Sequence, residues 1–62
     1  MQLLDNVILT VDLPSYDLQR GQAGTIVEIL AENTAFEVEF RDRDGRTLES
    51  IGLRPEQIML KA

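Results

Sequence analysis

A glycine-led run at residues 21–30 constrains the fold of this chain more than any other stretch. Gly21 and Gly24 lie three residues apart, and glycine tolerates the sharp turns and positive φ angles that other residues avoid. The Thr-Ile-Val sequence that follows them is β-branched, and such residues fit a half-buried pleated strand better than a helix. The run therefore predicts that a long loop ends at the glycines and that a central β-strand begins there.

Strict alternation at residues 35–41 gives the clearest strand in the chain. Phe36, Val38 and Phe40 fall on one face of this strand, and three charged residues fall on the other. A register slip of one residue would bury three charges, so the pattern specifies which face is inside. Similar apolar periodicity or β-branched content predicts four further strands, at residues 6–13, 25–30, 46–52 and 58–60.

Turn-forming residues separate these strands. Pro14 ends the first strand, and Asn33 is the residue best suited to a positive φ in the second connection. The Asp-Arg-Asp-Gly sequence at 42–45 predicts a tight hairpin turn, and Pro55 opens a single 3₁₀ turn before the last strand. The order of elements predicts an all-β fold, a small SH3-like five-stranded barrel formed by one domain over residues 1–62.

The alternation also predicts the core and the residues that shape the backbone. The predicted core residues are Val7, Leu9, Val11, Val27, Ile29, Phe36, Val38, Phe40, Ile51, Leu53 and Ile58. Gly21, Gly24 and Gly45 are predicted to be structural, because each stands where the chain must turn or approach a neighbour closely. Ile26 and Leu30 share a face with Glu28, which places them at a bend or in an exposed apolar strip.

Composition excludes several classes of function. The 62-residue chain has no Cys, no His and no Trp, so it lacks a disulfide, a thiol nucleophile and the commonest metal ligand and general base. Its net charge of -5 argues against nucleic acid and anionic membranes as partners, and it favours a basic protein partner. No signal peptide or membrane-spanning segment is apparent, which predicts a cytoplasmic location.

The residues also resemble a known family. The resemblance is carried by Leu13-Pro14, Leu18, Gly21, the run Gly24-Thr25-Ile26-Val27-Glu28-Ile29-Leu30, Val38-Glu39-Phe40 and Gly45-Arg46-Thr47. These residues are similar to those of a small bacterial family catalogued as domain of unknown function 4926, from about Leu4 to Leu60. The resemblance implies an SH3-like barrel, and it implies no established activity or site residue. Residues 21–29 are also similar to the KOW-type barrels of ribosomal and transcription-elongation proteins, which implies a nucleic-acid-associated role as the alternative.

The residues give little support to the hypotheses of catalysis and metal binding. Glu39, Asp42 and Asp44 lie near one hairpin, but a calcium loop needs six to eight oxygens, and this stretch lacks the bidentate Glu at the required distance. Ser15 and Ser50 have no His partner, and Gly21-x-x-Gly24 precedes a strand and lacks the Gly-Lys-Ser/Thr ending of a phosphate loop. We therefore expect no enzymatic activity, no metal and no cofactor.

Binding is the function that the residues favour. We expect a protein-interaction module whose partner contacts are Tyr16 and Leu18 together with the acidic residues Asp12, Asp17 and Glu28. Size and charge extend this prediction to the neutralisation of a cytosolic protein partner, as antitoxins do. A homo-oligomer held by edge strands is a further alternative. Several apolar residues exceed what so small a core must bury. They either form an exposed contact surface or are covered by the long loop and the N-terminal lead-in, and they are Leu3, Leu4, Tyr16, Leu18, Ile26, Leu30 and Met59.

Overall fold

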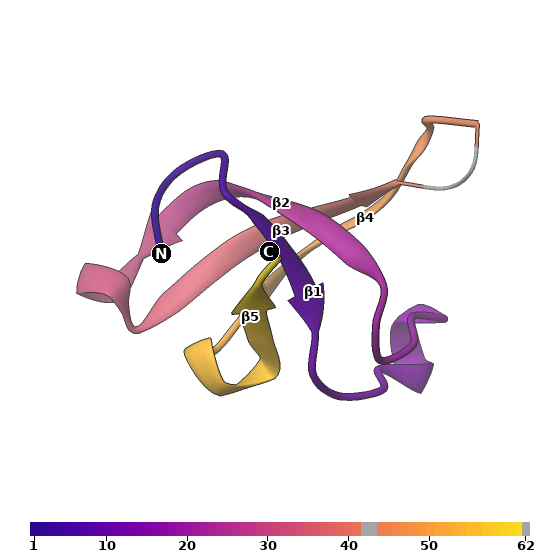
Figure 1. Cartoon of the computed structure of the whole chain (residues 1–62), viewed down its shortest axis with the longest axis horizontal. Helices are drawn as coiled ribbons and strands as arrows, with labels where there is room; N and C mark the ends of the chain where they lie inside the picture. Colours follow the sequence, from indigo (N-terminus) through magenta and orange to yellow (C-terminus); the bar gives the residue numbers. More distant parts are fainter. Residues whose placement is uncertain (42–43, 62) are drawn as a thin grey trace.

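Five short strands form one antiparallel sheet in the computed structural model, which describes residues 1–41 and 44–61 (Figure 1). The strands are β1 (Asn6–Leu9), β2 (Ala23–Leu30), β3 (Ala35–Arg41), β4 (Thr47–Leu53) and β5 (Ile58–Leu60). They are arranged in the order β4-β3-β2-β1-β5. The all-β class, the five strands and the 3₁₀ turn before the last strand (η3, Pro55–Gln57) are confirmed.

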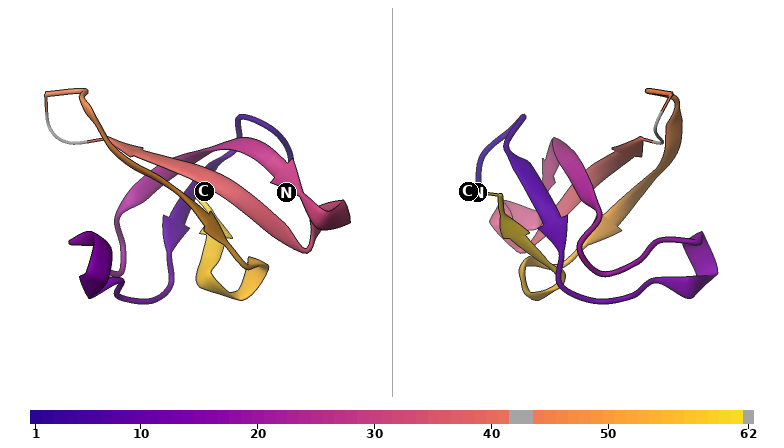
Figure 2. Two further views of the ribbon diagram at one scale, coloured as in Figure 1. Left: turned by 180° about the vertical axis from the view of Figure 1, so that it is seen from behind. Right: turned by 45° about the vertical axis from the view of Figure 1, so that its right-hand side comes forward.

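The sheet bends so that its two halves enclose one core. Figure 2 shows β1 and β5 turned across the direction of β2, β3 and β4. β4 and β5 are the two edges, and in the part of the chain that the structure describes no strand pairing joins them. The sheet is therefore open rather than a closed barrel, and the SH3-like assignment stays a prediction.

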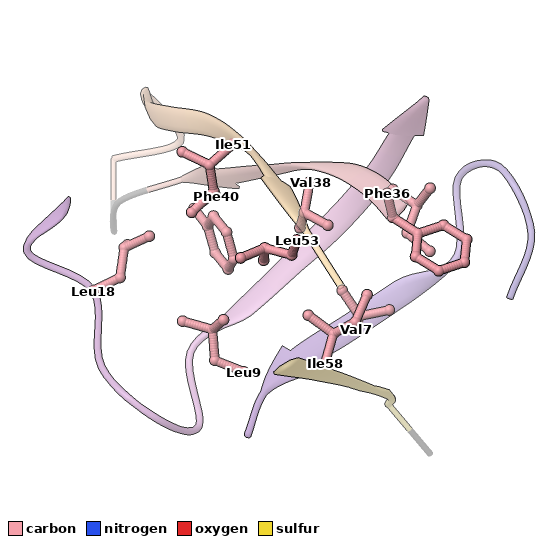
Figure 3. Close-up of a cluster of buried hydrophobic side chains, with 10 residues drawn as sticks. Val7, Leu9, Leu18, Phe36, Val38, Phe40, Ile51, Leu53 and Ile58 are labelled. Carbon is pink, nitrogen blue, oxygen red and sulfur yellow. The ribbon is translucent and has the colours of Figure 1, made fainter. Parts of the chain in front are cut away.

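Among the side chains that the structure describes, ten apolar ones form the core between the two halves of the sheet (Figure 3). They are Val7, Leu9, Leu18, Ile26, Phe36, Val38, Phe40, Ile51, Leu53 and Ile58. Eight of them were predicted from the alternation of apolar residues, and Leu18 and Ile26 were not. The described part of the core contains no buried polar or charged side chain, which is consistent with the cost of burying such groups without partners.

Three predicted core residues are wrong, and each error has a local cause. Val11 is exposed because β1 ends at Leu9, where the chain leaves the sheet. A bulge in β2 lies between Ile26 and Glu28, and the extra residue there is Val27. Ile26 therefore lies opposite Val38 and is buried, whereas Val27 is exposed. Ile29 returns to the inner face opposite Phe36, but it lies where the core ends and remains partly exposed.

Gly24 determines how closely β2 approaches the core. It lies opposite Phe40, and a Cβ atom at this position would meet Val38 Cγ1 at 2.8 Å and Phe40 Cε1 at 2.9 Å. The glycine is thus required by close contact with the Phe40 ring, not by a turn. Gly21 and Gly45 differ, because their φ angles of +93° and +80° lie in the region that side chains avoid.

The connections between strands follow the turn residues. Asn33 has the positive φ that was predicted for it, 72°. The connection forms a 3₁₀ turn, η2 (Ala31–Asn33), in which the two residues before Asn33 also have positive φ. The hairpin turn predicted at 42–45 includes Asp42 and Arg43, which lie outside the described residues. In η3 the Gln57 side chain accepts a hydrogen bond from the Arg54 backbone N–H at 2.8 Å.

Candidate functional site: the anchored loop between the first two strands

The candidate site is built on the loop at residues 10–22, which we call the anchored loop. Its tip is a hairpin-like turn in which Leu13 and Leu18 exchange two backbone hydrogen bonds, at 2.9 and 3.1 Å. Between them lies a 3₁₀ turn, η1 (Pro14–Tyr16), where Pro14 supplies a suitable φ at the first position. Asp17 ends this turn with a φ of 57°, in the left-handed region that Asp tolerates better than most residues.

Leu18 fastens the loop to the domain. Its side chain is only 1% exposed, and it lies at the end of the core formed by Leu9 and Phe40 (Figure 3). The prediction that Leu18 contacts a partner is therefore wrong, because its side chain is not accessible. The residue acts instead as an anchor, and its burial contributes about 2 kcal/mol to holding the loop against the sheet.

Backbone hydrogen bonds fasten the loop at further points. The Arg20 N–H donates to Asp12 Oδ1 at 2.8 Å, and the Gln19 N–H donates to Gln22 Oε1 at 2.7 Å. Gly21 N–H then donates to the Leu9 carbonyl oxygen at 2.9 Å, where the loop joins the sheet. One oxygen of Asp12, a predicted contact residue, thus already has a structural role. Hydrogen bonds within the chain thus hold the loop at several points along its length.

An open hollow of about 540 Å³ lies against this loop. It is lined by Asp12, Pro14, Asp17, Leu18 and Gln19. The structure thus brings together three of the predicted contact residues, the acidic residues Asp12 and Asp17 and the buried Leu18. Carboxylates beside an apolar residue such as Pro14 can accept hydrogen bonds from a guanidinium or ammonium group while its aliphatic stem packs on that residue.

Tyr16 projects from the same turn. The residue is 47% exposed, so nearly half of its surface remains available to a partner. Tyrosine is enriched at binding hot spots because it combines a large apolar ring with a polar end and few rotatable bonds. Its position on η1, between two points at which the loop is fastened, limits the entropy that the backbone would lose on binding.

Glu28 does not belong to this site. It lies on β2 directly opposite Glu37, five residues beyond Ala23, where β2 begins next to the anchored loop. At roughly 3.3 Å per residue, this distance is about 16 Å along the strand. The predicted set of five contact residues therefore divides: Asp12, Tyr16 and Asp17 are presented together, Leu18 supports them, and Glu28 lies near the other end of the sheet.

A second hollow, of about 310 Å³, was not predicted from the sequence. It lies on the outer face of the sheet and is lined by Asn6, Ala23, Gly24, Thr25, Glu39, Arg41 and Lys61. Arg41 donates two hydrogen bonds to Glu39 Oε1, from Nε at 3.0 Å and from Nη2 at 2.8 Å. The pairing of the strands brings these residues together from four segments of the chain, and no single stretch of sequence contains a signal for the hollow.

The arginines bear on the nucleic-acid alternative, which requires Arg41, Arg43, Arg46 and Arg54 to gather on one face. Arg41 is paired with Glu39 at 2.8 Å, and Arg54 is paired with Glu56 at 3.4 Å. Arg43 lies outside the described residues. A guanidinium paired with a carboxylate offers less net charge to a phosphate backbone, so the geometry gives this alternative no added support.

The apolar residues whose exposure the sequence left open are also divided by the structure. Leu18 and Ile26 are buried, and Leu30 is partly buried. Leu3, Leu4, Tyr16 and Met59 are exposed. Among the described residues, no three His, Cys, Asp or Glu side chains are grouped so that they would hold a metal ion. No helix in that part of the chain is long and apolar enough to cross a membrane.

These features define a small all-β domain with one bent antiparallel sheet and an ordered, acidic loop between its first two strands. The chain belongs to the family described as Domain of unknown function (DUF4926), which it matches over residues 3–60. The resemblance found in the sequence is thus confirmed for nearly the whole chain. No curated protein and no solved structure matches the chain.

Proposed function

We propose that this chain is a non-catalytic protein-interaction module that binds a basic segment of a protein partner through the anchored loop. The observation that carries the proposal is the arrangement at the loop tip. Tyr16 is exposed there, and the carboxylates of Asp12 and Asp17 border one hollow, while Leu18 holds the loop in place from inside. This arrangement presents an aromatic ring and negative charge on a preorganised backbone.

Preorganisation supports binding over other uses of the loop. A loop that is already ordered loses little conformational entropy when a partner docks, so more of the contact energy appears as affinity. The two backbone hydrogen bonds between Leu13 and Leu18 and the buried Leu18 side chain provide that order. These contacts support a loop that a partner can bind without reordering it.

Charge supports a basic partner. The chain carries eleven acidic and six basic residues, and Asp12 and Asp17 add two of the acidic ones at the hollow. Opposite charge on a partner would accelerate association and set the orientation of the encounter. The absence of His and Cys from the sequence favours binding rather than nucleophilic or general acid–base chemistry. In its most specific form, the proposal is that the module acts in the cytoplasm and neutralises a basic protein, as antitoxins do.

The test compares capture by matched variants. Wild-type protein, Tyr16→Ala, Asp17→Asn and Val11→Ala would be immobilised at equal density and exposed to cytosolic extract of the source organism. We expect one basic protein to be retained by the wild type and by Val11→Ala, an exposed residue outside the hollow. Retention should fall at least about tenfold for Tyr16→Ala, and it should weaken as salt is raised. The proposal is contradicted if no specific protein is recovered, or if both loop-tip variants retain it as well as the wild type.

A further inference from the structure

A short turn near the N-terminus, residues 2–5, presents two leucines to solvent, and we call it the leucine hook. The Asp5 N–H donates to the Gln2 carbonyl oxygen at 3.1 Å, and the Gln2 N–H donates to Asp5 Oδ2 at 2.8 Å. The hook is also joined to β2, because Leu4 N–H donates to the Ile26 carbonyl oxygen at 2.7 Å and Asp5 accepts from Ile26 N–H at 3.0 Å. Four hydrogen bonds therefore hold the two leucines in a defined place.

Leu4 occupies a position at which glycine is usual. Leu4 is the third residue of the turn, and its φ is 67°. Leu4 and Asp5 both bond to the backbone of Ile26, so two residues lie opposite one, and Leu4 is the first residue of this bulge. Both settings favour glycine, since a side chain in the left-handed region clashes with its own backbone. Nevertheless the residue is a leucine, and its side chain is 69% exposed, next to Leu3 at 55%. The backbone of Leu4 is strained and its side chain is solvated, so burial within this chain does not explain why a leucine stands there.

Figures 1 and 2 show residues 1–5 on the side of the domain where β2 ends and β3 begins. Further apolar residues remain uncovered in β2 and β5. Ile29 lies on the inner face opposite Phe36 and is 38% exposed. Leu60 lies on the inner face opposite Val7 and is 52% exposed. The core is thus incompletely closed on the side of the hook. Exposed apolar surface of this kind marks contact sites in small soluble domains.

The charges around these residues indicate which partner would fit. In the segments that carry them, residues 1–5, 27–33 and 59–61, the charged groups are the carboxylates of Asp5, Glu28 and Glu32, the N-terminal ammonium of Met1 and the ammonium of Lys61. Three carboxylates against two ammonium groups leave these segments with a net negative charge. A second copy of the chain would bring like charges together, whereas a partner with basic residues beside an apolar stripe would complement both properties.

We infer that the leucine hook anchors a second binding surface, and that its occupant is a cationic amphipathic segment of a partner protein. Leu3 and Leu4 insert among the apolar residues of that segment, and Glu28 and Glu32 face its basic residues. This surface lies at the opposite end of the core from the anchored loop. The inference about the hook can therefore be tested independently of the function proposed for Tyr16 and Asp17.

The test uses two model helical peptides as probes, one with a leucine face and a lysine face and one in which glutamate replaces lysine. Isotopically labelled protein would be titrated with each peptide, and amide and methyl shifts would be followed by NMR. We expect the lysine peptide to bind and to shift the signals of Leu3, Leu4, Ile29 and Leu60. The glutamate peptide should bind at least tenfold more weakly.

Leu4→Gly is the informative variant, because it removes the side chain and the backbone strain together. We expect it to unfold at the same temperature as the wild type or a higher one, and to bind the lysine peptide at least tenfold more weakly. Leu4→Asn, which also tolerates a positive φ, gives the same comparison if the glycine variant proves unstable. Val11→Ala, at an exposed residue that lies outside both the hollow and the hook, should bind the lysine peptide as the wild type does.

Three results would overturn the inference. The first is a wild-type protein that binds neither peptide, or that binds both equally. The second is a folded Leu4→Gly or Leu4→Asn variant with unchanged affinity, or shifts confined to the anchored loop. The third is concentration-dependent self-association of the wild type that Leu4→Gly abolishes, since this would identify a second copy as the occupant. If instead the hook binds as expected and the capture experiment on Tyr16 fails, only the function proposed for the loop is lost.

Discussion

The segments at the two ends of the core differ in how far their apolar side chains are buried. At one end, the anchored loop folds back and inserts Leu18, which is almost completely buried beside Leu9 and Phe40. At the other end, the leucine hook runs along β2 and leaves Leu3 and Leu4 more exposed than buried. Both segments are held by backbone hydrogen bonds, so the contrast concerns only the side chains.

The difference separates residues that stabilise the domain from residues that are available to a partner. Burying a leucine contributes about 2 kcal/mol, whereas an exposed leucine contributes little and, in a left-handed conformation, costs about 1–2 kcal/mol. Leu18 therefore accounts for the order of the anchored loop, and Leu4 adds nothing comparable to the fold. Stability explains the apolar residue at one end and leaves the apolar residues at the other end to be explained by binding.

The largest expected effect is that of Leu18→Ala. Removing a fully buried leucine should lower the free energy of unfolding by about 2–4 kcal/mol, a large part of what a domain near 60 residues possesses. Urea denaturation followed by circular dichroism measures this change. Leu60→Ala is the matched control from the hook end, and it should cost less than about 1 kcal/mol because its side chain is half exposed. An equal loss of unfolding free energy in the two variants would contradict the contrast between the two ends of the core.

Gly24→Ala should have the next largest effect, because Gly24 lies against the Phe40 ring near the anchored loop. A methyl group there would be 2.8 Å from Val38 Cγ1 and 3.0 Å from the Glu39 carbonyl oxygen, which forces the core apart. We expect a loss of about 1–3 kcal/mol, measured by thermal unfolding. Gly52→Ala provides the control, since its methyl group would meet Glu37 Oε2 at an ordinary 3.6 Å. A Gly52→Ala variant as unstable as Gly24→Ala would refute this account of the Phe40 contact.

A smaller effect is expected for Asp12→Ala, which tests how the anchored loop is fastened. The variant removes the acceptor of the Arg20 N–H and should cost about 1 kcal/mol. Hydrogen exchange of the Arg20 amide should become faster, because its N–H has lost its hydrogen-bond acceptor. Asp17→Asn should leave both stability and this exchange rate unchanged, because Asp17 contributes its carboxylate to the hollow and only its backbone to the turn. If Asp17→Asn destabilises the loop as much, then its carboxylate is structural.

The smallest effect, and the only one expected to be favourable, is that of Leu4→Gly. Relief of the left-handed conformation should raise the free energy of unfolding by about 1–2 kcal/mol. The greater freedom of glycine in the unfolded chain should lower it by about 0.5–1 kcal/mol. The net change is a stabilisation of about 0.5–1 kcal/mol, measured by urea denaturation beside Leu18→Ala. A loss of more than about 1 kcal/mol would show that Leu4 packs as a core residue, and the two ends would then be alike.

Local patterns in the sequence predicted most of the fold. The bounds predicted for β3 and β5 agree with the observed Ala35–Arg41 and Ile58–Leu60. Both strands are defined by residues within them, through alternation in β3 and through the preceding Pro55 turn in β5. The end of β1 was predicted four residues late, because its apolar alternation continues into the loop after the hydrogen bonds with β2 have ended.

The candidate site was predicted in part, for a related reason. The sequence identified the loop and its acidic residues, and Tyr16 is exposed as expected. It did not distinguish Leu18, which is buried, from Tyr16, which is not, because two apolar residues in one loop have the same local pattern. It also grouped Glu28 with the loop, although the length of β2 carries Glu28 to the other end of the sheet.

Thus the sequence by itself determined the all-β class, the number and order of the strands, the turns and the inward face of β3, since each depends on neighbouring residues. The tertiary structure alone decided the bulge at Val27, the close approach at Gly24, and which loop residue closes the core. These features depend on the fit between segments far apart in the chain. Burial is a property of that fit, and no single segment contains it.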